Sequence, residues 1–208
     1  WSAAFGFTQT ELGQITGEDT STVMHDITTA AEALVGANLH EYRLSSRKLM
    51  EILPHGNSAR AGIEMAILDA MCKSLNIPLY SYLGGAPFLI ETDVTIPICE
   101  PGHAREKAAA LSAKGFKRFK VKVGIDMDED IARVLAISEG APGCAFILDA
   151  NQGFTPSQAI KFTDRLLNRG LEIILLEQPV DAIDLEGMRH VTSRSRVPVF
   201  ADESAQTA

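Results

Sequence analysis

The sequence is short of cysteine and aromatic residues, and it has no long hydrophobic run. Its three cysteines, Cys72, Cys99 and Cys144, are odd in number and stand at no spacing typical of metal ligands. Each lies among apolar residues, so we expect buried free thiols in a reducing compartment rather than disulfides or a zinc site. No apolar run approaches the roughly 20 residues that a membrane-spanning helix needs.

Positive charge is also scarce, because 19 Lys and Arg residues face 27 Asp and Glu residues, which gives a formal net charge of −8. Nucleic acids and anionic membranes repel an acidic protein, so neither is an expected partner. The remaining composition, with 46% hydrophobic and 22% charged residues, is ordinary for a soluble globular protein. We therefore expect a soluble intracellular protein, most simply a cytoplasmic one.

Both ends of the sequence look like truncation points rather than natural termini. The chain opens on Trp1 instead of Met, and it closes at Ala208 directly after a strand-like run. We expect a fragment truncated at both ends. An organelle-targeting segment ahead of Trp1 therefore stays an open alternative to the cytoplasm.

Three short apolar runs each end on a carboxylate. They are Ala145–Asp149, Glu172–Glu177 and Val197–Asp202, and the carboxylates follow one another at intervals of roughly 25 to 28 residues. A fourth run, Arg118–Lys122, carries two lysines and comes one interval earlier. Segments with helical periodicity separate the runs. Strict alternation of strand and helix predicts an α/β fold with a parallel sheet, and polar groups at the carboxyl ends of strands are typical of the active-site face of a barrel.

The pattern of predicted secondary structure changes near residue 90. Upstream, helical patterns cover about 22–34, 45–52 and 58–75. Downstream, the strand–helix alternation runs to the end of the chain and is long enough for about five strands, fewer than a closed barrel of eight. We therefore predict two domains, residues 1–90 and residues 91–208, of which the second is the first part of a (β/α) barrel of the TIM type.

Asp149, Glu177 and Asp202 are candidate metal ligands. Any one of them alone is explained as well by helix capping or by exposure to solvent. Three at near-regular barrel spacing are different, because successive strand ends point towards a common centre, where unpaired carboxylates would repel one another. A divalent cation removes this repulsion, and an all-oxygen set of ligands favours Mg²⁺ or Mn²⁺ over zinc.

Lys120 and Lys122 are candidate catalytic residues, since residues two apart in a strand share one face. They could be outward lysines of a solvated edge strand, but Phe119, Val121 and Val123 predict a central strand whose other face packs on helices. The lysines would then point into the barrel. There, their mutual repulsion and a nearby cation would lower a lysine pKa and supply a neutral amine as a general base.

Asn151, Gln178 and Glu203 stand next to the candidate ligands in the sequence. Asn151 and Gln178 could orient the ligands by hydrogen bonding, or they could serve as ordinary turn and cap residues. Glu203 directly follows Asp202 and would pair with a barrel lysine if the strand ends before it. The pair Gly84-Gly85 lacks the surrounding pattern of a phosphate-binding loop, so we interpret it as a turn.

Taken together, these residues resemble the enolase superfamily and, within it, the muconate-lactonizing-enzyme subgroup. The resemblance covers nearly the whole chain and rests on the order and spacing of four motifs: Lys120-Val-Lys122, Leu148-Asp-Ala-Asn-Gln-Gly153, Leu176-Glu-Gln-Pro179 and Ala201-Asp-Glu-Ser204. The Asp-Ala-Asn-Gln-Gly form of the second motif looks most like the dipeptide epimerases, of which the L-Ala-D/L-Glu epimerases are familiar members. By the same resemblance, residues 1–90 are part of an α+β capping domain.

The resemblance implies Mg²⁺-dependent removal of an α-proton from a carboxylate substrate through an enolate. One ion would be held by Asp149, Glu177 and Asp202. Lys122 would exchange the proton, while Lys120 would steady the enolate oxygen and lower the pKa of Lys122. The expected reaction is epimerisation of a dipeptide such as L-Ala-L/D-Glu. Muconate cycloisomerisation, o-succinylbenzoate synthesis and a non-catalytic truncated relic remain alternatives.

The resemblance also sets limits on what these 208 residues do alone. Inversion in this subgroup uses a second lysine, which would lie on a later strand beyond Ala208, and subgroup members are often homo-oligomers. We expect the complete protein to be an isomerase acting on amino-acid derivatives. We expect the fragment by itself to be inactive and poorly soluble, because the edges of an incomplete barrel favour aggregation.

Overall fold

A computed structural model of the chain describes residues 18–86, 89 and 91–205. The chain divides into two compact units, Trp1–Leu89 and Ile90–Ala208. Each unit has a hydrophobic core of its own. The first unit is helical where it is described, and the second alternates strands with helices.

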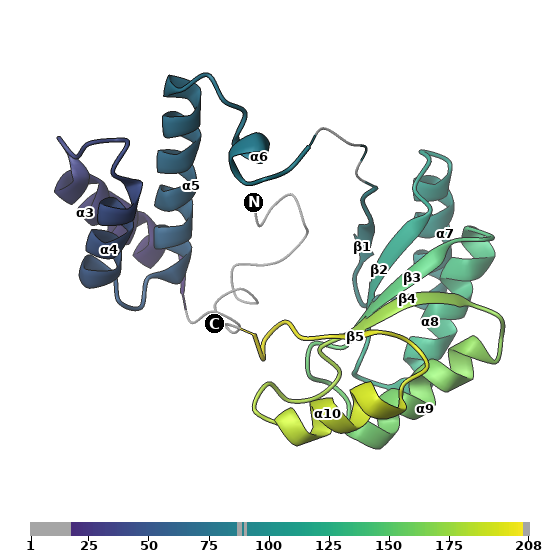
Figure 1. Ribbon diagram of the computed structural model, residues 1–208. Helices are drawn as coiled ribbons and strands as arrows, with labels where there is room; N and C mark the ends of the chain where they lie inside the picture. The colour runs from purple at the N-terminus through teal and green to yellow at the C-terminus, as the bar shows by residue number, and fades with distance from the viewer. Residues whose placement is uncertain (1–17, 87–88, 90, 206–208) are drawn as a thin grey trace. The chain divides into compact units, whose positions relative to one another are not determined.

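The described helices of the first unit are α3 (Thr20–Leu34), α4 (Tyr42–Ile52), α5 (Asn57–Ser74) and the short α6 (Leu79–Tyr82), shown in Figure 1. Helix α3 begins after Asp19, whose carboxylate accepts a hydrogen bond of 2.8 Å from the Thr22 amide. The three longer helices lie where helical patterns are predicted. Helix α6 is not predicted, because four residues are too few to show a periodicity.

The second unit contains five strands and four helices among its described residues: β1 (Val94–Ile96), α7 (Pro101–Ser112), β2 (Arg118–Lys122), α8 (Met127–Gly140), β3 (Ala145–Asp149), α9 (Pro156–Leu167), β4 (Glu172–Glu177), α10 (Leu185–Arg194) and β5 (Val199–Phe200). The strands form one parallel sheet in the order β1-β2-β3-β4-β5, and Figure 1 shows the helices along one side of it. The predicted α/β fold with parallel strands is confirmed.

Local signals in the sequence explain where the helices of this unit begin. The Asp126 carboxylate accepts hydrogen bonds from the amides of Asp128 and Glu129 and so caps α8. Helix α9 starts with a reciprocal capping box between Thr155 and Gln158. These caps set the points at which α8 and α9 begin, and therefore where the loops after β2 and β3 end.

The core of the second unit lies between the sheet and its helices. On β2, Phe119 and Val121 are fully buried, whereas the alternating Lys120 and Lys122 are only partly buried on the other face. The buried side packs against apolar residues of α7, α8 and α9, among them Ala108, Val134, Ile137, Phe162 and Leu166. The predicted division of β2 into a helix-covered face and a lysine face is confirmed.

The strands pair in a register that changes once. Lys122 of β2 stands opposite Asp149 of β3, and Asp149 stands opposite Glu177 of β4. Between β3 and β4 the register shifts, because Phe146 is paired with Ile173 whereas the next residue of β3, Ile147, is paired with Leu175. Strand β4 therefore contains one residue more than β3 over the same length.

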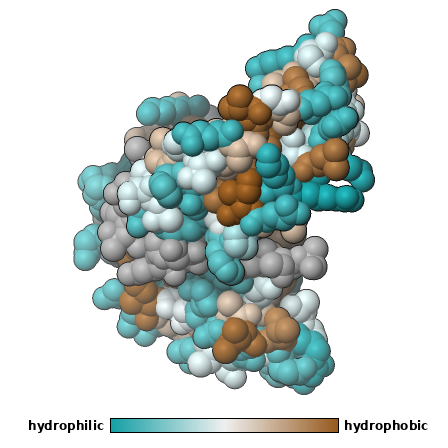
Figure 2. Space-filling view, turned by 90° about the vertical axis from the view of Figure 1, so that its left-hand side faces the viewer, coloured by the Kyte–Doolittle hydropathy of each residue, from teal (hydrophilic) through white to brown (hydrophobic). Residues whose placement is uncertain are grey.

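Large hydrophobic side chains are exposed at several places on the described surface. Figure 2 shows hydrophobic residues in several places among hydrophilic ones on the face in view. Ile125, Ile183 and Phe200, at or just after strand ends, are each more than half exposed. Among the described residues, no helix is both long and apolar enough to cross a membrane.

All three cysteines are free thiols, as predicted. Cys72 and Cys144 are buried, and Cys99 is partly buried. Burial raises the pKa of the Cys144 thiol to about 11, with a further increase from the charge of Glu172. Cys144 therefore stays protonated and unreactive at neutral pH.

The turns after β2 and β3 interlock through two glycines. Gly124 has a φ of +105°, and a Cβ at this position would lie 2.6 Å from the Ala150 carbonyl oxygen. A Cβ on Gly153 would in turn collide with the backbone of Gly124. Only residues without side chains allow this close approach.

Gly124→Ala is expected to lower the free energy of unfolding by more than about 1–2 kcal/mol, because it adds a clash to an unfavourable backbone conformation. The matched control is Gly102→Ala in α7, where a Cβ would have no neighbour within 4 Å. Since alanine favours the helix, this control should raise stability by about 0.5–1 kcal/mol. Urea unfolding of both variants checks the prediction, and equal effects would contradict it.

Candidate functional site

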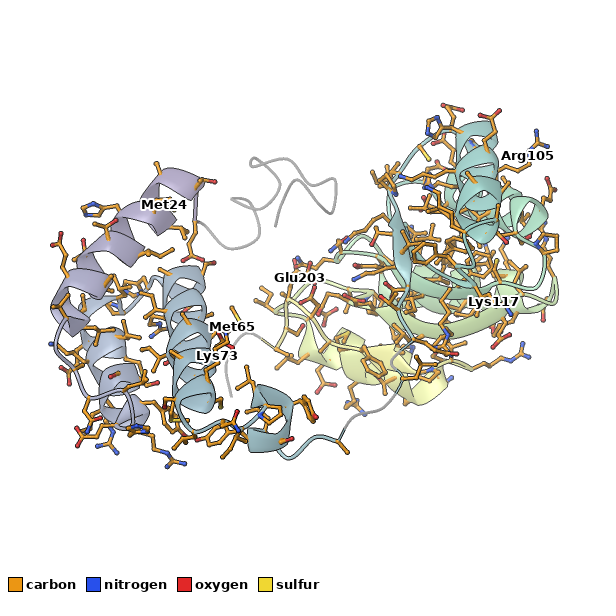
Figure 3. All side chains as sticks on the ribbon, turned by 90° about the horizontal axis from the view of Figure 1, so that it is seen from above. Met24, Met65, Lys73, Arg105, Lys117 and Glu203 are labelled. Carbon is orange, nitrogen blue, oxygen red and sulfur yellow. The ribbon has the colours of Figure 1, made fainter. Side chains whose placement is uncertain are left out.

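The candidate site lies at the carboxyl end of the parallel sheet, where the register of β2, β3 and β4 places Lys122, Asp149 and Glu177 in one row. Lys120 lies on the same face of β2, two residues before Lys122. Figure 3 shows Glu203, which follows β5, away from Lys117, which precedes β2. The sheet thus brings residues far apart in the sequence to one edge.

The Lys120 ammonium bridges two of the candidate metal ligands. Its Nζ lies 2.9 Å from Oδ2 of Asp149 and 2.8 Å from Oε1 of Glu177. The Asp149 side chain is 1% exposed, whereas those of Lys120 and Glu177 are about one fifth exposed. The bridge therefore places one positive charge between two carboxylates at the rim of the core.

Lys122 belongs to a chain of hydrogen bonds that crosses the site. Its Nζ donates to Oδ2 of Asp149 at 2.8 Å and to Oδ1 of Asn151 at 2.6 Å. Asn151 Nδ2 donates to Oε1 of Glu203 at 3.1 Å. Glu203 is buried, and its Oε2 has no hydrogen-bond partner among the described residues. Glu203 thus reaches Lys122 through Asn151, a link that sequence reasoning did not anticipate.

The charges of this cluster shift its pKa values in opposite directions. Burial would lower the pKa of Lys120, but its hydrogen bonds and charge interactions with Glu177 and Asp149 outweigh burial and raise it. Burial would likewise raise the pKa of Asp149, but Lys122 and Lys120 together lower it. The sequence led us to expect a lowered lysine pKa, but the pKa of Lys120 shifts the opposite way, because Glu177 and Asp149 stabilise its charged form.

The other two carboxylates have raised pKa values. Burial is the main cause for Glu177, and the charges of Asp149 and Asp202 add to it. Burial is also the main cause for Asp202, followed by the charges of Glu203 and Asp149. Asp149, Glu177 and Asp202 therefore interact electrostatically, which is the crowding of carboxylates that a cation relieves.

Three carboxylates at the ends of neighbouring strands fit Mg²⁺ in donor type, because this cation prefers oxygen ligands. As placed, however, no group of three or more His, Cys, Asp or Glu side chains within the described part of the chain is arranged to hold a metal ion. Asp149 and Glu177 instead turn towards Lys120. Each of these lysine contacts uses one carboxylate oxygen, Oδ2 of Asp149 and Oε1 of Glu177, and a carboxylate can accept a hydrogen bond and bind a cation at once.

The turns after β3 and β4 contain residues with unusual backbone conformations, and hydrogen bonds join the two turns. Asn151, Gln152 and Gln178 have positive φ values of 40°, 72° and 34°, which non-glycine residues rarely adopt. The Gln152 amide donates to the Gln178 carbonyl at 2.8 Å, and the Ala182 amide donates to Oε1 of Gln152 at 2.9 Å. The turns after β3 and β4 therefore support each other, and such strain is typical of functional sites.

Gln178 is fully buried and links the end of β4 to the segment after β5. Its Oε1 accepts hydrogen bonds from the amides of Asp202 and Ser204, and its Nε2 donates to the Val180 carbonyl and to Ser204 Oγ. Gln178 combines the two roles considered from the sequence, because it bonds to the Val180 carbonyl within its own turn and also holds the backbone of the candidate ligand Asp202. The sequence signal for a role at the site was the position of Gln178 directly after the candidate ligand Glu177.

Comparison with known proteins places both units in known families. Residues 103–208 match the family model described as enolase C-terminal domain-like. Residues 8–84 match the N-terminal domain of mandelate racemase and muconate lactonizing enzyme. The first of these matches alone covers half of the chain.

Several characterised proteins are similar over most of this chain. An L-Ala-D/L-amino acid epimerase from Populus trichocarpa is 42% identical over 199 residues, which are 93% of this chain and 47% of that protein. An L-Ala-D/L-Glu epimerase from Bacillus subtilis is 36% identical, over 84% of this chain and 48% of that protein. The chain thus spans about half the length of these relatives.

Solved structures agree with the sequence comparison. A dipeptide epimerase from Enterococcus faecalis, crystallised with Mg and the dipeptide L-Leu-L-Tyr, superposes with a TM-score of 0.85 and 36% identity, over 92% of this chain and 54% of that one. The expected partial barrel and the expected superfamily are both confirmed. This chain belongs to the mandelate racemase and muconate lactonizing enzyme family of the enolase superfamily.

Proposed function

We propose that this chain supplies the metal-binding carboxylates and one catalytic base of an enzyme that epimerises a dipeptide at the α-carbon of one residue. The observation that carries the proposal is the row formed by Lys122, Asp149 and Glu177, with Lys120 bridging the two carboxylates. The dipeptide substrates of its relatives support the choice of substrate.

In this proposal, Asp149, Glu177 and Asp202 hold one Mg²⁺ ion. When bound, the ion would neutralise the substrate carboxylate and so make the adjacent α-proton more acidic. Burial is the main cause of the raised pKa values of Glu177 and Asp202, and the charges of neighbouring carboxylates raise them further. This crowding of negative charge supports a cation at this place. The backbone N–H of Asp202 donates a hydrogen bond to Oε1 of Gln178, and this bond limits the positions that the Asp202 ligand can take.

Lys122 takes the α-proton in the proposed reaction. The C–H bond breaks, an N–H bond forms on Nζ, and the electron pair moves into the substrate carboxylate to give an enolate. The hydrogen bonds from Lys122 to Asp149 and Asn151 hold its amine at the row. An acid on the opposite face must return a proton to the α-carbon, since inversion requires the proton to leave one side and arrive on the other.

Lys120 stabilises the negative charge of the enolate. Its two carboxylate neighbours raise its pKa, so it remains an ammonium at neutral pH. A fixed positive charge in a partly buried site stabilises a developing anion more strongly than it would in water. This division of labour, with Lys122 as the base and Lys120 as the electrostatic partner, distinguishes the two lysines experimentally.

Lys122→Ala in the complete protein should abolish exchange of the α-proton with D₂O from one face of a dipeptide, with a loss of about 10²- to 10⁴-fold for removal of a general base. Proton NMR with a panel of dipeptides and Mg²⁺ measures the exchange. Lys117→Ala is the matched control, because this exposed lysine precedes the same strand. Undiminished exchange in Lys122→Ala would refute the assignment.

Asp149→Asn should weaken Mg²⁺ binding by at least about 10- to 100-fold, the loss typical even for partners outside the ligand set. Titration calorimetry of the protein with Mg²⁺ measures the affinity directly and does not depend on catalysis. The control, Asp164→Asn, lies in α9 with its side chain 40% exposed and should bind Mg²⁺ as the unaltered protein does. Equal affinities in all three proteins would remove Asp149 from the ligands.

A further inference from the structure

A buried ion pair in helix α8 has no part in the site described above. Asp130 is fully buried and Arg133 is 2% exposed, and their side chains form an ion pair within one turn of the helix. Placing charges in a protein core is costly unless partners satisfy them. The Nε of Arg133 nevertheless lacks a hydrogen-bond partner among the described residues. A pair retained at this cost calls for a role beyond stability.

The second carboxylate oxygen of Asp130 faces the end of β2, the strand that carries Lys120 and Lys122. While Oδ1 pairs with Arg133, Oδ2 accepts hydrogen bonds from the Gly124 amide at 2.7 Å and from the Ile125 amide at 3.3 Å. These amides follow β2, and Gly124 comes two residues after Lys122. Hydrogen bonds to an ionised acceptor are stronger than those to a neutral one. Asp130 thus fixes the point at which the chain leaves β2.

Gly124 also contacts the turn that carries Asn151. Its backbone packs against Ala150 and Gly153, which flank Asn151 and Gln152, and this contact leaves no room for a side chain at either glycine. The neighbouring Val123 amide donates to the Asp149 carbonyl at 2.9 Å. A shift of Gly124 would therefore displace both Lys122 and the Asn151 turn to which its amine is bound.

We propose that Asp130 is a positioning residue for Lys122, acting through the Gly124 amide, and that Arg133 holds the Asp130 side chain in place by pairing with its other carboxylate oxygen. The inference rests on the proposed function, in which Lys122 is the base. Misplacement of a reacting group by about 1 Å can cost about a hundredfold in rate, even when its cause lies away from the chemistry. The effect is expected on the face served by Lys122 and not on the opposite face.

Two double variants separate the hydrogen-bond acceptor from the buried charge. Asp130→Asn with Arg133→Met removes both charges but keeps an oxygen that can accept from Gly124. Asp130→Ala with Arg133→Met removes both charges and the acceptor. Neither variant leaves an unpaired charge in the core, so both avoid the main cause of misfolding. Asp128→Ala is the surface control, because Asp128 also lies in α8 and forms an exposed ion pair with Arg165 of α9.

The experiment measures α-proton exchange in D₂O separately for the two epimers of one dipeptide, and Lys122→Ala identifies the epimer whose proton this lysine removes. We expect the double variant without the acceptor, which carries Asp130→Ala, to exchange that proton about 10- to 100-fold more slowly than the double variant that keeps it, which carries Asp130→Asn. Exchange from the opposite face should be the same in both, and Asp128→Ala should alter neither. Equal rates in the two double variants, or equal losses on both faces, would overturn the proposal.

Amide hydrogen exchange distinguishes failure of this inference from failure of the proposed function. In the acceptor-free variant, the amides of Gly124 and Ile125 should lose protection, whereas the variant with Asp130→Asn should keep it. If the complete, unaltered protein exchanges no α-proton of any dipeptide, the proposed function fails, and the amide protection alone then decides whether Asp130 anchors β2. Unchanged protection of Gly124 in the acceptor-free variant would overturn the anchoring itself.

Discussion

The parallel register of β2, β3 and β4 is the constraint on which the site depends. It places a lysine and two carboxylates in one row at the rim of the core, where each side chain is partly removed from water. An isolated charge there would be costly, so the members of the row stabilise one another. Each carboxylate has two oxygens, so Asp149 and Glu177 can keep their lysine partners and still present an oxygen to a cation.

The site is held less by side-chain packing than by backbone contacts between successive turns. The turns after β2 and β3 meet at Gly124 and Gly153, and the turns after β3 and β4 meet through Gln152 and Gln178. Gln178 then binds the segment after β5. Each strand end is therefore positioned by its neighbour. A displacement of one turn would therefore displace the next. Strained backbone conformations persist in these turns because contacts with the neighbouring turns fix them.

Much of the fold and the members of the candidate site could be predicted from the sequence. Alternation of Phe119, Lys120, Val121 and Lys122 determines which face of β2 is buried, and the recurrence of a carboxylate at each strand end predicts a shared edge. Hydrogen bonds between distant turns leave no such periodic signal. Asp130 and Arg133 were therefore missed, since a charged pair one helical turn apart normally indicates an exposed face.

The register shift between β3 and β4 makes the position of the Glu177 carboxylate depend on the number of residues in β4. Were β4 to continue the pairing that begins at Phe146 and Ile173, Asp149 would stand opposite Leu176, and Glu177 would fall one place beyond it. Since neighbouring residues of a strand point to opposite faces, the one additional residue decides which side of the sheet receives the second carboxylate. A chimera that imports β4 from a relative must therefore preserve the number of residues in this strand as well as the acidic residue at its end.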